Sequence, residues 1–168
     1  MLHTDAELIS LLHRVDDPES LECPPGYNHT ETRALFDCLV DRLDTAFATR
    51  CMADRSVQDA SLHARVEVPA AATKIGEGIV VSVSNFGLMA VVAAENPGVY
   101  LDTTEAVEEA ALHADDLAAV ERALIELGYV VLPERLLTRP YNGVSAPLLS
   151  YYGEGRPCDW WIRYFDYL

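Results

Sequence analysis

The sequence predicts an α+β fold in which N-terminal helices pack on an antiparallel sheet. Apolar residues recur at helical spacing over the first 50 residues, and they alternate with polar residues beyond residue 60. The chain has 168 residues, half of them hydrophobic, so it can bury a core, and a second domain would have little room. We therefore expect a single domain over 1–168.

Two helices begin the predicted fold. Thr4 and Glu7 have the spacing of a capping box, in which each side chain accepts a hydrogen bond from the other residue's backbone N–H. They predict a helix over 5–14, and Asn28 can cap a second helix over 30–49. The second helix carries one apolar stripe, made of Phe36, Leu39, Val40, Leu43 and Phe47.

The next segments have the patterns of strands. Residues 62–68 alternate apolar with polar side chains, and residues 79–84 are rich in β-branched side chains. The turn residues Asn85-Phe86-Gly87 separate that strand from 88–93, so a hairpin is expected. The apolar run 129–132 predicts a further buried strand.

A strongly acidic helical region precedes that last strand. We expect helix over 103–127, with a break near His113. Between Glu95 and Glu134 there are ten acidic residues and one basic residue, Arg122. Such a region is either a solvated helical surface or a docking surface for a basic partner.

The C-terminal region is the most aromatic part of the chain. It holds both tryptophans and the five tyrosines Tyr141, Tyr151, Tyr152, Tyr164 and Tyr167. Residues 160–167 predict a strand with aromatic side chains on both faces, paired with 148–152 in a C-terminal aromatic hairpin. We expect Trp161 and Phe165 in the core. Tyr151 and Tyr152 belong either to the core or to a recognition surface.

The charge of the chain excludes several classes of function. A formal charge of −15 opposes binding to nucleic acids and to anionic membranes. No segment has the ~18–20 continuous apolar residues of a membrane-spanning helix. The first residues also lack the basic and apolar segments of a secretory signal, so we expect a cytoplasmic protein.

The sequence contains no familiar catalytic motif. The four cysteines lack paired metal-ligand spacing and the five histidines lie far apart, so we expect no metal and no cofactor. Cys158 stands close to Arg156 and Asp159, and a nearby cation can activate a thiol. With His63 or His113 as its partner, that thiol would serve a small hydrolase or transferase; otherwise Cys158 is a structural residue.

One stretch resembles a known pattern. Leu127-Gly128, Leu132-Pro133 and Asn142-Gly143 resemble a leucine-glycine, leucine-proline, asparagine-glycine pattern of the SMI1/KNR4-like immunity domains. In those domains the pattern lies near the start, whereas here it lies near the end. The chain is therefore not assigned to that family.

The sequence favours a small acidic protein-binding domain of the inhibitor or immunity kind, which docks a basic protein partner. The alternatives are the Cys158 enzyme and a homodimer that forms through an exposed aromatic strand. The candidate partner-binding residues are Glu105, Glu108, Glu109, Asp115, Asp116, Tyr151 and Tyr152.

Overall fold

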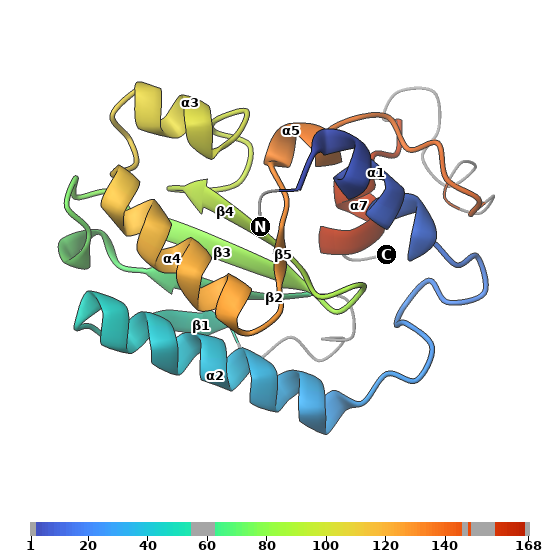
Figure 1. Ribbon diagram of the computed structural model, residues 1–168, viewed down its shortest axis with the longest axis horizontal. Helices are drawn as coiled ribbons and strands as arrows, with labels where there is room; N and C mark the ends of the chain where they lie inside the picture. The colour runs from blue at the N-terminus through green and yellow to red at the C-terminus, as the bar shows by residue number, and fades with distance from the viewer. Residues whose placement is uncertain (1–2, 55–62, 146–147, 149–156, 167–168) are drawn as a thin grey trace.

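A mixed β-sheet with helices on both faces forms the centre of the protein (Figure 1). The computed structural model describes residues 3–54, 63–145, 148 and 157–166. Within these residues, five strands form one sheet in the spatial order β1 (Met52–Asp54), β2 (His63–Val68), β3 (Ile79–Ser84), β4 (Met89–Ala94) and β5 (Val130–Val131). The α+β class is confirmed, and β1 is an additional strand that the sequence pattern did not predict.

The strands pair antiparallel except at one edge. The predicted hairpin is confirmed as β3 and β4, with Ile79 opposite Ala94 and Ser84 opposite Met89. Strand β5 runs parallel to β4, with Met89 opposite Val130, so the expectation of a wholly antiparallel sheet is wrong at this edge. The physical reason is the long helical connection between β4 and β5. It carries the chain back to the end of the sheet where β4 begins, so β5 runs in the same direction as β4.

Capping fixes the start of the first two helices, α1 (Asp5–Arg14) and α2 (His29–Phe47). The Thr4 hydroxyl accepts from the Glu7 N–H at 3.3 Å, and the Glu7 carboxylate accepts from the Thr4 N–H at 2.7 Å. Asn28 Oδ1 accepts from the first N–H groups of α2. Both predicted helices are confirmed, and Cys38 lies on the exposed side of α2.

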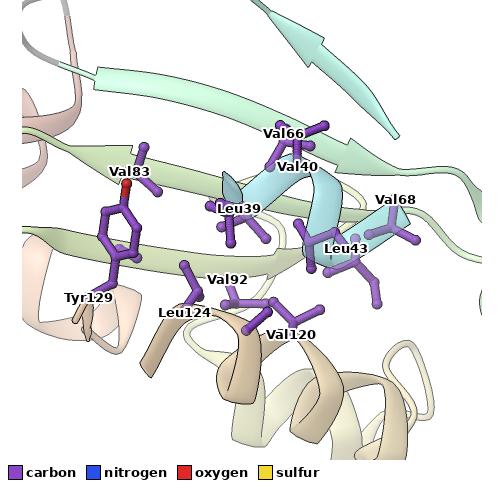
Figure 2. Packing of buried hydrophobic residues seen from close by; sticks show 14 of the residues in the cluster. Leu39, Val40, Leu43, Val66, Val68, Val83, Val92, Val120, Leu124 and Tyr129 are labelled. Atoms are coloured by element: carbon purple, nitrogen blue, oxygen red, sulfur yellow. The ribbon is translucent and has the colours of Figure 1, made fainter. Parts of the chain in front are cut away.

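One face of the sheet is covered by α2 and α4 (Ala114–Glu126), with α3 (Thr103–Glu108) close to the end of β4. The predicted helical region is therefore confirmed, including its break near His113. Figure 2 shows the contact, in which Leu39 and Leu43 of α2 meet Val120 and Leu124 of α4 above the sheet.

The opposite face is covered by α1, α5 (Glu134–Leu137) and α7 (Trp160–Phe165). Alternation along β4 separates the two cores, because Met89 and Val91 belong to this second cluster while Ala90 and Val92 belong to the first. Figure 1 shows α1, α5 and α7 gathered together, so both ends of the described chain contribute to one layer.

The C-terminal aromatic segment is helical, which corrects the predicted strand. Asp159 caps α7 by accepting from the Ile162 N–H at 2.9 Å. The rings of Trp160 and Tyr164 stack at 5.9 Å between centroids, one helical turn apart. The residues expected to form the partner strand, 148–152, lie outside the described residues except for Leu148.

No helix in the described ranges is long and apolar enough to cross a membrane.

The surface expected to form a homodimer was an exposed aromatic strand. Because residues 160–165 form a helix in which Trp160, Tyr164 and Phe165 are buried, that prediction loses the surface on which it was based.

Candidate protein-binding surface

Four carboxylates from three segments of the chain act on Tyr100, which lies in the loop between β4 and α3. Partial burial and the negative charges of Glu95, Glu77, Glu109 and Glu105 together raise the pKa of the Tyr100 phenol. Val99 and Leu101, its neighbours in the chain, have exposed apolar side chains. The Tyr100 surface, as we call it, consists of Glu77, Glu95, Val99, Tyr100, Leu101, Glu105 and Glu109.

The open end of the β3–β4 hairpin places two of these carboxylates. The Glu95 N–H donates to the Gly78 carbonyl at 2.7 Å, which extends the ladder one pair beyond Ile79 and Ala94. Glu77 and Glu95 therefore lie at the same edge of the molecule. The sequence reasoning missed both residues, because it predicted the hairpin without the strand register that brings residues 78 and 95 together.

Hydrogen bonds at the start of α3 hold the rest of the loop. Asp102 caps the helix by accepting from the Thr104 N–H at 2.9 Å, and its carboxylate also accepts from Arg135 Nε of α5 at 3.0 Å. Glu105 accepts from the Leu101 N–H at 2.6 Å. The loop is thus fixed to two helices, so its exposed side chains have defined positions.

The centre of the Tyr100 surface is apolar. Val99 is 49% exposed and Leu101 is 66% exposed, while Tyr100, which stands between them in the chain, is half-buried and packs against the first core. Large apolar side chains exposed inside a ring of charge are typical of protein interfaces, where an apolar centre is surrounded by a polar rim.

The structure divides the seven residues predicted from the sequence into three groups. Glu105 and Glu109 belong to the Tyr100 surface, and Glu108 is exposed in the last turn of α3. Tyr151 and Tyr152 lie outside the described residues.

Asp115 and Asp116 form the third group, because both bind Lys74 within the fold. The Lys74 ammonium forms an ion pair with the Asp115 carboxylate and thereby lowers the pKa of that carboxyl. Asp116 is buried and accepts from the Lys74 backbone N–H at 2.7 Å. These two residues hold the β2–β3 connection against the start of α4.

Cys158 has the environment of a structural thiol. It is buried, and burial together with the negative charge of Asp159 raises its pKa to about 11. An activated thiol needs the opposite shift. His113 is engaged as the cap of α4, where its Nδ1 accepts from the Asp115 N–H at 3.1 Å, and the His63 side chain lies outside the described residues.

Most of the described aromatic residues near the C-terminus fill the second core. Tyr141, Trp160 and Phe165 are buried, as expected for Phe165, while Trp161 is half-buried. In the part of the chain that the structure describes, no group of three or more His, Cys, Asp or Glu residues is placed to hold a metal ion.

No protein-family model, curated protein or solved structure matches the chain. The surfaces of the molecule itself therefore supply the grounds for proposing a function.

Proposed function

We propose that the chain is a protein-binding domain of the inhibitor or immunity kind, which docks a basic protein partner on its Tyr100 surface. The observation that carries this proposal is that four carboxylates act on Tyr100, which stands in the chain between the exposed Val99 and Leu101. A partner with basic side chains around an apolar contact would match this surface in both charge and hydropathy.

The two parts of the surface have different roles in the proposed complex. Carboxylates on a chain with a charge of −15 attract a basic partner over a distance and speed the encounter. Burial of Val99, Tyr100 and Leu101 then slows dissociation, because aromatic and apolar side chains in a desolvated centre carry most of the binding energy.

The test reverses the charge of three carboxylates that surround Tyr100. The variant E77K/E95K/E109K leaves Glu105 in place because that side chain also holds the Leu101 N–H. The matched control, E19K/E22K/D41K, changes the net charge equally at exposed positions outside the Tyr100 surface. Partners are captured from a lysate of the source organism at ~50 mM and ~500 mM NaCl and identified by mass spectrometry.

We expect the wild type and the control to capture the same basic protein at low salt. The variant E77K/E95K/E109K should no longer capture this basic protein. High salt should weaken its capture by the wild type and by the control. Equal capture by all three proteins, or capture of no basic protein by any of them, would contradict the proposal. Thermal midpoints of the three proteins show whether each variant remains folded.

A further inference from the structure

A pocket of about 380 Å³ borders the Tyr100 surface. One wall is the loop 96–98, which connects Glu95 to Val99, and the other walls include Arg65 of β2, Glu134 of α5 and Trp161 of α7. We call it the Glu134 pocket. The same loop therefore contributes to both the pocket and the Tyr100 surface.

Among the residues that the structure describes, Glu134 has no cationic partner. Glu134 is one of the residues that line the pocket although it is only 6% exposed, and the Gly98 backbone N–H donates to its carboxylate. Within the described residues no lysine or arginine pairs with it. Burial raises the pKa of Glu134, as expected for a carboxylate whose charge is not compensated.

The other polar groups of the pocket are already engaged. Arg65 donates to Asn96 Oδ1 at 2.6 Å, which turns its guanidinium toward the loop. Asp159 caps α7 and adds a second negative charge to the walls. Trp161 is half-buried and its ring is fixed by stacking on Phe165, with 5.2 Å between the centroids.

We propose that the Glu134 pocket receives an arginine side chain of the basic partner. This inference rests on the proposed function and names the anchor of that interface. The planar guanidinium can donate two parallel hydrogen bonds to the Glu134 carboxylate while it stacks on the Trp161 ring. Lysine lacks this fork and is more strongly hydrated, so arginine fits the pocket better.

The test uses a small probe, so it does not require the partner. N-acetyl-arginine-N-methylamide is titrated into the full chain labelled with ¹⁵N, and the indole N–H signal of Trp161 is followed by NMR. Trp160 is buried, only 3% exposed, so its indole signal is the internal reference. The neutral citrulline analogue has almost the same shape and is the matched control ligand.

We expect the arginine probe to shift the Trp161 signal with a dissociation constant on the order of 1 mM, and citrulline to bind about tenfold more weakly. E134Q should abolish the difference between the two ligands, whereas E108Q should preserve it. E134Q should remain folded, because the amide oxygen can still accept from Gly98 and the buried charge is removed.

Three outcomes would overturn the inference: no Trp161 shift up to ~50 mM probe, equal binding of arginine and citrulline, or a shift caused by N-acetyl-glutamate-N-methylamide in place of the arginine probe. The last outcome would make Arg65 the ligand-binding group. Because the probe needs no partner, its failure leaves capture through the Tyr100 surface standing. Probe binding without any basic partner would instead contradict the proposed function and leave the pocket as an arginine site without a protein partner.

Discussion

Arg163 is a fully buried cation whose hydrogen bonds join distant parts of the chain. Its Nε donates to Asp16 Oδ1 at 2.8 Å, and its guanidinium lies over the rings of Phe86 and Tyr164 at 4.7 and 4.8 Å. Its remaining donors reach the backbone carbonyls of Asp17, Ser20 and Leu21. The desolvation cost of the cation is thus offset by a carboxylate, three carbonyls and two aromatic faces.

The first prediction concerns the carboxylate of this pair. In Asp16→Asn, Arg163 would stay buried without a counter-charge, so we expect a loss of about 3–5 kcal/mol in the free energy of unfolding. Urea unfolding at pH 7 measures this loss. The control variant is Glu19→Gln, an exposed change in the same loop. A loss equal to that of the control would contradict the assigned role of the pair.

The pH dependence of the same pair follows from the direction of the Asp16 pKa. Burial opposes ionisation, but hydrogen bonds from Tyr141, Arg163 and Val144 outweigh it and hold the pKa below its ordinary value of 3.8. A lowered pKa means that this stabilisation is present above pH 3.8 and is lost as the pH falls through the folded-state value. The difference between the wild type and Asp16→Asn should therefore shrink in acid.

At the scale of elements, α7 is where the sequence pattern was ambiguous. Apolar side chains occupy both faces of residues 160–165 whether the segment is a strand or a helix, so alternation alone could not decide between them. The residues that decide are Asp159, which caps the helix, and the aromatic pairs spaced by four, 160 with 164 and 161 with 165. That spacing was visible in the sequence.

The second prediction tests this account of α7. Asp159→Ala removes the side chain that accepts from the Ile162 N–H, so we expect a loss of about 1 kcal/mol in the free energy of unfolding. The near-UV circular dichroism of the stacked aromatic rings should also weaken. Asp41→Ala, on an exposed position of α2, is the control and should leave both measurements unchanged.

The candidate surface was predictable in part. The carboxylates of α3 were found because helical periodicity and charge density are local properties of the sequence. Glu77, Glu95 and the Glu134 pocket depend on segments that only the sheet and the second core bring together. Burial of Asp116 was likewise invisible, because its partner is the backbone of Lys74, in another connection.

Across the whole molecule, negative charge is in excess, and part of it is concentrated in one place. The chain carries a net charge of −15, and four of its carboxylates gather around one tyrosine. Mutual repulsion among such groups destabilises the folded state and is screened by salt. At the Tyr100 surface this repulsion opposes folding.

The third prediction follows from that repulsion. Raising KCl from ~20 mM to ~300 mM should raise the thermal midpoint of the wild type by about 2–5 °C. The variant E77K/E95K/E109K should respond less than the matched control E19K/E22K/D41K, because it removes the densest repulsion. Differential scanning calorimetry measures the midpoints. Equal salt responses in the two variants would show that the repulsion is spread evenly over the surface.

The contact between Asp16 and Arg163 spans 147 positions of the sequence, which has a consequence for synthesis. A chain made from its N-terminus completes β4 and the helices α2 and α4 before Arg163 exists. Until then the face of the sheet that carries Met89 and Val91 has no α7 to cover it, and Asp16 has no cation. A chaperone acting on the growing chain would therefore meet an apolar sheet face, closed only when α7 docks beside α1.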